Sequence, residues 1–394
     1  MEHQCSYDCL IIGAGFAGAV AARELAQRGN QRVLVLEQRS HIGGNAYDCY
    51  NDDGVLIHQY GPHIFHTNNQ RVYDYLSQFT HWYPYEHKVV GAIHGQYLPI
   101  PFNFHSLHMA FPEEQAQQLE QLLTDTYGHG RKVTILELRK SRHPALKALA
   151  DYVYQNVFAY YTQKQWGTAP EDMDPSVTAR VPVLLSQDDR YFQDIYQGMP
   201  AEGYTKLFEA MLDHPHITVR TKTDARDHLT IQEQTILLDG VPFSGPVIYT
   251  GAVDALFDHV FGRLPYRTLD FSFETYPQTE YQTHGTVNYT VSEAYTRITE
   301  FKHLTGQKLE GKTTIAKEYS RAYTGAEGEI PYYAILNPDN LSLYAKYRAL
   351  AQKIPNLHLL GRLAEYRYYN MDAIVAQALS LSDDLLKEQE NKAL

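Results

Sequence analysis

Four short apolar runs, far apart along the chain, predict buried strands of a single sheet. They cover residues 7–12, 32–36, 246–249 and 357–361, and a helical pattern over 19–27 follows the first of them. After the last run, Asn370 is placed to cap a helix that we expect to end near Leu381, followed by a frayed polar tail. The pattern predicts one α/β domain assembled from the beginning, the middle and the end of the chain.

The residues between these runs follow two other patterns. Apolar positions recur at helical spacing over 103–161, most clearly over 115–127 and 144–161. β-Branched and aromatic residues alternate instead over 88–98, 287–298 and 312–319, which is typical of an antiparallel sheet. We therefore expect a helical insert and an antiparallel sheet that interrupt the α/β domain.

The first predicted strand runs directly into a glycine turn typical of dinucleotide-binding domains. Gly13 permits the tight turn, Gly15 lets the backbone approach a pyrophosphate, and Gly18 lets the next helix pack closely on the strand. Glu37 ends the second strand 19 residues after Gly18, near the spacing of about 20 residues expected for the acid that binds a ribose hydroxyl. These features together predict an adenine dinucleotide with its phosphates at the helix N-terminus.

Two further features favour FAD over NAD. A second glycine pair, Gly43 and Gly44, follows Glu37 and would allow another close backbone approach to a long, bent cofactor. Near the C-terminus, the strand that ends at Gly361 precedes the helix capped by Asn370, whose N-terminal dipole would suit a negatively charged flavin ring. Each feature alone also fits an ordinary turn or helix cap, so the preference for FAD depends on their combination.

The charge balance and the cysteines exclude several classes of partner. Lys and Arg number 34 against 46 Asp and Glu, and the net charge of −12 has the wrong sign for nonspecific attraction to nucleic acid or anionic lipid. No apolar run has the length of a membrane span and the N-terminus lacks a signal-peptide pattern, so we expect a cytoplasmic protein without membrane partners. The three cysteines form no CxxC pair, and we predict neither a disulfide framework nor a metal site.

Tyrosine is unusually frequent, at 32 residues, and many tyrosines lie beside arginine in the second half of the chain. Phenol rings stack and hydrogen-bond at once, which suits a cleft for a sugar and a base. Composition alone fits a tyrosine-rich sheet surface equally well, so this feature needs support from motifs.

Four strings of sequence supply that support. They are HIGGNAY at 41–47, YGPHIFHT at 60–67, YTQKQWG at 161–167 and GRLAEYRYY at 361–369. In these strings and in their order, the chain resembles the bacterial UDP-galactopyranose mutases from residue 7 to about residue 380. The resemblance implies a discontinuous Rossmann-like FAD-binding domain with an inserted helical domain and an antiparallel β-sheet domain.

This fold agrees with the pattern of apolar positions, and it leads to predicted domain boundaries. The FAD-binding domain comprises residues 1–77, 203–262 and 352–394, the helical insert with a mobile substrate loop comprises 101–179, and the antiparallel-sheet domain comprises 78–100, 180–202 and 263–351.

The resemblance also implies an activity. The enzyme would be an isomerase that interconverts UDP-galactopyranose and UDP-galactofuranose, with no net oxidation or reduction. Reduced FAD would be the active cofactor, and its N5 would form a covalent adduct with the anomeric carbon of galactose while UDP leaves. A reductant such as NAD(P)H, a homodimer and a role in supplying galactofuran for cell walls are further implications of the resemblance.

Site residues follow from the same match. Arg180 and Arg297 resemble the two arginines that hold the diphosphate, and with His63 they form the predicted catalytic set. The predicted substrate-binding residues are Phe158, Tyr161, Thr162, Trp166, Arg180, Tyr191, Asn288, Arg297, Tyr319, Tyr366 and Tyr368. The predicted cofactor-binding residues are Gly13, Gly15, Phe16, Gly18, Glu37, Gln38, Gly44, Asn45, His63, Gly251, Arg362, Asn370 and Met371.

The chain departs from the family pattern at Asn370, where several members have Asp, so no acid–base role is expected there. Two other functions fit parts of the sequence. An FAD oxidase or desaturase of the amine-oxidase type would share the glycine turn, and a non-catalytic dinucleotide sensor would need nothing else. Trp166 and the two arginines favour a nucleotide diphosphate over an amine, and a sensor leaves them unexplained.

Overall fold

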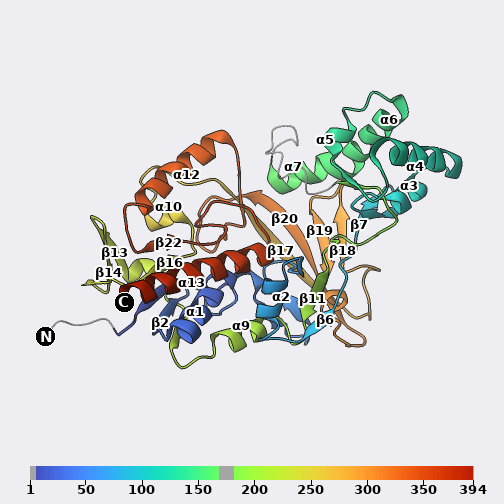
Figure 1. Cartoon of the computed structure of the whole chain (residues 1–394). Coiled ribbons are helices and arrows are strands. Elements are labelled where there is room, and N and C mark those ends of the chain that lie inside the picture. Colours follow the sequence, from blue (N-terminus) through green and yellow to red (C-terminus); the bar gives the residue numbers. More distant parts are fainter. Residues whose placement is uncertain (1–5, 168–181, 394) are drawn as a thin grey trace.

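The computed structural model describes residues 6–167 and 182–393 (Figure 1). Arg180 and the part of the predicted substrate loop that follows Gly167 lie outside the described residues. Figure 1 shows a small sheet flanked by long helices on the left, a larger sheet in the middle and a group of helices at the upper right.

The first sheet is parallel and joins segments from distant parts of the chain. Its order is β12 (Ile217–Arg220), β2 (Val33–Leu36), β1 (Cys9–Ile12), β16 (Val247–Tyr249) and β22 (Leu357–Leu359). Strands β1, β2 and β16 are buried along their whole length, as expected when both faces of a parallel sheet are covered. One face packs on α1 (Phe16–Gly29) and α13 (Met371–Ala393). The Rossmann-like α/β fold predicted from the apolar runs is thereby confirmed.

Helix α13 is longer than the sequence suggested. We expected it to end near Leu381 with a frayed tail, and this is wrong, because the helix continues to Ala393. Leu385 and Leu386 are buried against α1, and a Cβ at Gly29 of α1 would lie 2.6 Å from Leu386 Cδ2. Helices α1 and α13 lie in close contact, as Figure 1 shows, and this contact stabilises the C-terminal part of α13, whose exposed face is polar.

The second sheet has seven strands in the order β21 (Tyr333–Ala334), β17 (Tyr266–Tyr276), β20 (Thr313–Ala322), β19 (Arg297–Glu300), β18 (Thr286–Tyr289), β7 (Val89–Ile93) and β8 (Gln96–Ile100). It is antiparallel except between β18 and β7, which run parallel, so the prediction of a purely antiparallel sheet needs this correction. The two strands are far apart in sequence, so no tight hairpin imposes an antiparallel pairing on them. The longest strand, β17, was not predicted, although Leu269, Phe271 and Phe273 alternate within it.

The helical insert has its own apolar core. It contains α3 (Phe104–Ala110), α4 (Glu113–Tyr127), α5 (Ile135–Leu138), α6 (Pro144–Val153) and α7 (Tyr160–Trp166), with a π-helical segment, Tyr154–Ala159, between the last two. Leu119, Leu123, Leu146 and Leu149 bring α4 and α6 together. Helix α3 packs on β8 of the seven-stranded sheet, and α7 packs on β20 of the same sheet, where Figure 1 shows α7 below the rest of the insert.

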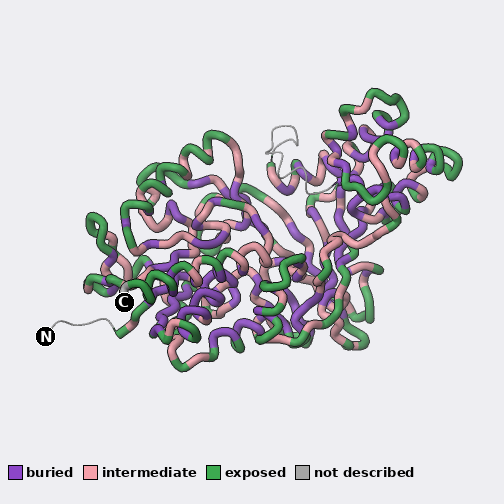
Figure 2. Tube along the Cα trace, viewed as in Figure 1, coloured by how far each residue is buried: buried purple, intermediate pink, exposed green. Residues whose placement is uncertain are grey.

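Smaller elements connect the two sheets and the insert. They are β3 (Asp48–Tyr50), β4 (Leu56–His58), β5 (Phe65–Thr67), α2 (Gln70–Leu76), β6 (Trp82–Pro84), β9 (Lys132–Val133), β10 (Val183–Leu184), β11 (Tyr196–Pro200), α9 (Tyr204–Leu212), β13 (Leu229–Gln232), β14 (Thr235–Leu238), β15 (Val241–Pro242), α10 (Val253–Leu256), α11 (Phe301–Thr305) and α12 (Pro338–Ala351). Figure 2 shows that burial is concentrated around α1 and the two sheets, while the outer turns of the insert are exposed. Within the described ranges, none of the helices combines the length and apolar character needed to cross a bilayer.

Candidate functional site

A cavity of about 1080 Å³ extends from the carboxyl ends of β1 and β2 to the seven-stranded sheet and α7. The carboxyl edge of a parallel sheet is where doubly wound folds bind their ligands. Most of the predicted site residues lie in its wall. They are Gly13, Gly15, Phe16, Glu37, Gln38, Gly44, Asn45, His63, Phe158, Tyr161, Thr162, Trp166, Tyr191, Gly251, Asn288, Arg297, Arg362, Tyr368, Asn370 and Met371.

Among the described residues, three that we predicted for the site do not line this cavity. Gly18 supports it indirectly, because a Cβ at this position would lie 1.9 Å from Gly13 O and would push the helix away from the glycine turn. Tyr319 lies on β20, where its ring meets the edge of Tyr295 at 6.0 Å. The third residue, Tyr366, requires a correction.

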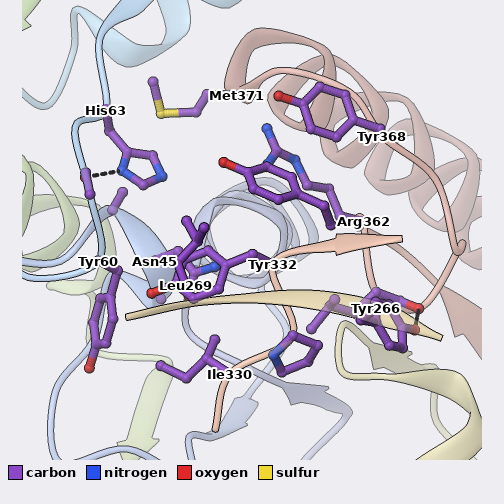
Figure 3. Close-up of a pocket in the computed structure, with 18 of the residues that line it drawn as sticks. Asn45, Tyr60, His63, Tyr266, Leu269, Ile330, Tyr332, Arg362, Tyr368 and Met371 are labelled. Atoms are coloured by element: carbon purple, nitrogen blue, oxygen red, sulfur yellow. Dashed lines mark hydrogen bonds between the residues drawn. The ribbon is translucent and has the colours of Figure 1, made fainter. Parts of the chain in front are cut away.

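Tyr366 is a core residue. It is 1% exposed, and its hydroxyl donates to the backbone oxygens of Pro265, at 2.6 Å, and Ile335, at 3.1 Å. The backbone of Tyr366 has a φ of +46°, and the side chain packs into the cluster that contains Tyr266 and Tyr347. The prediction that Tyr366 binds substrate is therefore not supported, whereas Tyr368, two residues later, faces the cavity (Figure 3).

The glycine turn is held by Glu37 as well as by its own backbone. Glu37 Oε2 accepts a hydrogen bond from the amide of Ala14 at 2.8 Å, and Oε1 accepts one from the amide of Arg39 at 2.9 Å. This carboxylate is 5% exposed and lines the cavity, so it has oxygen lone pairs left for a ligand hydroxyl. Glu37 thus connects the shape of the turn with the predicted ribose site.

Gly15 and Gly44 bring two loops together at the predicted diphosphate position. Gly15 has an ordinary φ of −80°, and a Cβ there would meet nothing closer than Gly44 Cα at 3.6 Å. Gly44 has a φ of +57°, and a Cβ there would lie 3.0 Å from Gly15 Cα. The protein itself therefore does not require glycine at position 15. A side chain there would instead enter the space in front of α1, which is the space that a pyrophosphate needs.

Arg39 is a residue of this region that the sequence analysis missed. Its Nη2 donates to Asn45 Oδ1 at 2.8 Å, and its guanidinium lies over the ring of Tyr60 at 4.4 Å. Its Nη1 is buried without a hydrogen-bond partner among the described residues. A cation with a spare donor beside the two glycine loops suits an anionic dinucleotide, and its position two residues after Glu37 was the available signal.

His63, Arg362, Tyr368 and Met371 surround one part of the cavity (Figure 3). Nδ1 of His63 donates to Gly61 O at 2.9 Å, which leaves Nε2 of the neutral ring as an acceptor. Arg362 Nε donates to Tyr369 O at 2.6 Å, and its guanidinium lies 4.7 Å from the ring centre of Tyr368. The arrangement offers one fixed cation and one neutral imidazole to a group bound between them.

Three histidines in or near the cavity are held neutral by burial. Desolvation lowers the pKa of His58 to about 4 and the pKa of His63 and His87 to about 3 each. Nδ1 of His58 accepts a hydrogen bond from the amide of His63 at 3.1 Å, so a proton on that nitrogen would break the contact. None of these rings can serve as a cationic acid near neutral pH.

We expect the protein to lose stability as the pH falls from 7 to 5. An unfolded imidazole has a pKa near 6.5, so the unfolded state binds protons that buried His58 and His87 and partly buried His63 do not bind in the folded protein. Unfolding therefore becomes easier by up to about 1.4 kcal/mol per pH unit and ring. Carboxylate neighbours raise the pKa of His108 and His303, which opposes the trend, whereas desolvation lowers the pKa of His41, His284 and His358 and adds to it. The net change on acidification should be a loss of stability.

Urea unfolding at pH 5, 6 and 7 measures this dependence. His58→Asn should make the pH dependence shallower by about one proton, whereas substitution of the exposed His143 by Asn should leave it unchanged. A pH dependence in His58→Asn as steep as that of the unaltered protein would contradict the assignment.

At the far end of the cavity, Arg297 on β19 lies opposite Glu318 on β20. Arg297 Nη2 and Glu318 Oε1 are 3.1 Å apart, and the Glu318 side chain is 3% exposed. Desolvation acts against the charge of Arg297, but the carboxylate of Glu318 outweighs it and raises the arginine pKa above its ordinary value. Arg297 is therefore a permanent cation, oriented by a buried partner that the sequence analysis missed.

Several polar atoms of residues in the cavity wall have no hydrogen-bond partner among the described residues. Arg297 Nε, Asn288 Oδ1 and Gln165 Oε1 are buried, and their residues line the cavity. Buried polar groups in folded proteins are nearly always hydrogen-bonded. The pattern indicates a polar ligand that binds beside Arg297.

Aromatic rings cover the same end of the cavity. The rings of Trp166, Tyr333 and Tyr368 form an aromatic wall, with Trp166 5.5 Å from Tyr333 and 6.0 Å from Tyr368. Tyr161 lines the cavity nearby, and burial raises its pKa, so its hydroxyl stays protonated. Tyr333 was missed, although it belongs to the tyrosine-rich second half of the chain.

Comparison with known proteins identifies the family. A family model described as UDP-galactopyranose mutase matches residues 156–368, and one described as an NAD(P)-binding Rossmann-like domain matches residues 11–79. A UDP-galactopyranose mutase of Mycoplasma pneumoniae is 36% identical over 97% of this chain and 96% of its own length. A dTDP-fucopyranose mutase of Escherichia coli is 34% identical over 97% of this chain and 99% of its own length.

Solved structures agree with the fold. A crystal structure of reduced UDP-galactopyranose mutase aligns with a TM-score of 0.71 at 16% identity, covering 98% of this chain and 94% of the other. The resemblance suggested by the four sequence strings is therefore not confined to them, because the relatives match 97% of this chain. The chain belongs to the UDP-galactopyranose mutase family, whose members are isomerases.

Proposed function

We propose that this protein interconverts UDP-galactopyranose and UDP-galactofuranose with reduced FAD as its cofactor. Fold and family imply a flavin, and the glycine loops, Glu37 and Arg39 suit the dinucleotide part of FAD. The observation that carries the proposal is that one cavity joins these loops to Arg297 and the aromatic wall. A dinucleotide in the first part would thus meet a sugar nucleotide in the second.

When bound, reduced FAD supplies the nucleophile for the anomeric carbon, and the conversion is redox-neutral. The residues of the chain position and hold the substrate. Arg297 binds the diphosphate, assisted by Arg180, and keeps UDP close to the sugar between departure and return. Trp166 and Tyr161 stack with and enclose the nucleotide and exclude water. His63 accepts a hydrogen bond through Nε2, in keeping with its low pKa.

Other features of the proposal depend on the family resemblance. We propose a homodimer, a cytoplasmic location, a reductant such as NAD(P)H and the domain boundaries given above. Asn370 lines the cavity, and its backbone oxygen accepts from the amide of Ile374 at 3.1 Å, which is compatible with a place at the start of α13.

A visible spectrum followed by a product assay tests the function. The purified protein should show flavin absorption bands, and the dithionite-reduced protein should convert UDP-galactofuranose to UDP-galactopyranose, separated by chromatography. A colourless protein that takes up no FAD would refute the proposal. Hydrogen peroxide production from an amine would indicate an oxidase, and a preference for dTDP-fucopyranose would indicate the activity named for the Escherichia coli relative.

A further inference from the structure

The last turn of α7 is fastened to the seven-stranded sheet by side chains outside the cavity. The final carbonyl groups of a helix have no partners within the helix. Here, Arg267 of β17 donates from Nη2 to Lys164 O at 3.0 Å and from Nε to Gln165 O at 3.1 Å. Ser320 of β20 donates from Oγ to Gln165 O at 2.7 Å. The sheet therefore caps this helix, and the cation is favourably placed at its negative end.

Lys164 fastens the same turn in another direction. Its ammonium group donates to the backbone oxygens of Tyr289, Glu293 and Tyr295 at 2.6, 2.7 and 2.8 Å. These oxygens belong to the end of β18 and to the loop that leads to β19. An ammonium group has three donors, so each one is used. We call Lys164, Arg267 and Ser320 the clamp.

The clamp also determines how the chain leaves α7. Gly167 ends the helix with a φ of +72°, and a Cβ at this position would lie 2.7 Å from Arg267 Nη1. Trp166 is therefore fixed on both sides along the chain. Lys164, two residues before it, is held by three backbone oxygens, and Gly167, directly after it, packs against Arg267. Its ring lies in the aromatic wall beside Tyr333 and Tyr368.

We propose that Lys164 and Arg267 are positioning residues that hold Trp166 in the substrate site. Neither residue lines the cavity. The cavity is lined by Gln165 and Trp166, which follow Lys164 in the last turn of α7. Arg267 is 7% exposed and has no carboxylate partner among the described residues, so the cost of burying its charge is offset by its hydrogen bonds to Lys164 O, Gln165 O and Ser320 Oγ. The effect on turnover rests on the proposed function, but the placement of Trp166 does not.

Trp166 fluorescence tests the proposal without substrate. The chain contains two tryptophans, so Trp82→Phe leaves Trp166 as the single indole. In this background, Lys164→Met and Arg267→Met should shift Trp166 emission to the red and increase its quenching by acrylamide. Lys164→Arg should restore part of the original emission, and Lys147→Met, on the exposed side of α6, should have no effect.

Turnover provides the second readout. The two methionine variants should lower kcat/KM by about 10- to 100-fold, mainly through KM, because a displaced Trp166 no longer encloses the nucleotide. If Lys164→Met fails to fold, Arg267→Lys replaces it, since lysine keeps the charge but cannot span both carbonyl groups. Unchanged emission, quenching and KM in a folded variant would overturn the proposal. Absence of mutase activity in the parent protein would refute the proposed function and leave the fluorescence test of the clamp intact.

Discussion

Replacement of Arg297 by alanine is expected to lower kcat by at least about 10²- to 10³-fold, with the flavin colour retained. Arg297 lines the cavity together with Asn288, its partner on the neighbouring strand, whose Oδ1 is buried without a hydrogen-bond partner among the described residues. Its loss removes the positive charge that we propose to hold the diphosphate. It also leaves the Glu318 carboxylate buried and unpaired, which costs about 3 to 5 kcal/mol and repels an anionic substrate.

Steady-state turnover and flavin absorbance of matched variants measure this effect. Arg297→Lys should retain intermediate activity, because lysine keeps the charge without the two-pronged geometry. The double variant Arg297→Ala, Glu318→Ala should recover stability but not turnover. Arg28→Ala, which removes an arginine paired with Glu24 and Asp383 outside the cavity wall, should leave turnover unchanged. Normal turnover in Arg297→Ala would refute the assignment.

Arg180→Ala should show a similar loss, a prediction that depends on the sequence match alone because Arg180 lies outside the described residues. Loss of Arg180 leaves the pair of Arg297 and Glu318 intact. The difference in turnover between Arg180→Ala and Arg297→Ala therefore measures the added effect of leaving Glu318 unpaired.

Replacement of Gly15 by valine is expected to give a folded protein that binds almost no FAD. The backbone at Gly15 is in a region that any residue adopts, and its Cβ would make only an ordinary contact with Gly44. The branched side chain would instead fill the space where the two glycine loops leave room for phosphates. The loss should appear as a colourless protein and as a fall in FAD affinity of about 100-fold or more, since the backbone approach is lost.

A neighbouring glycine provides the contrast. Gly18→Ala places a methyl group 1.9 Å from Gly13 O, so this small change should destabilise the whole domain. Circular dichroism, thermal unfolding and FAD titration of both variants separate loss of fold from loss of cofactor. A yellow Gly15→Val protein with normal FAD affinity would show that the cofactor does not lie across this turn.

The end of the cavity that we propose for the substrate shows the limits of the sequence analysis. Tyr366 and Tyr368 looked equivalent in the string GRLAEYRYY, yet a positive φ at Tyr366 turns its side chain into the core. Glu318 and Tyr333 carry no local motif. Strand pairing brings Glu318 opposite Arg297, and the packing of α7 on the sheet brings Trp166 beside Tyr333. Lys164 was part of a family string, but its three backbone partners lie more than 120 residues later.

Local signals were sufficient for the glycine turn, the acid that follows it and the strands β1, β2, β16 and β22 of the parallel sheet, because apolar runs, turn geometry and ribose spacing each depend on residues close together in sequence. The edge strand β12 was not predicted, because it is only partly buried and has no apolar run. The family strings added the predicted chemistry. Tertiary structure alone decided which tyrosines face the cavity, which carboxylate orients Arg297, how far α13 extends and what holds Trp166. These features depend on register between distant strands and on side-chain contacts across the fold, which no short stretch of sequence specifies.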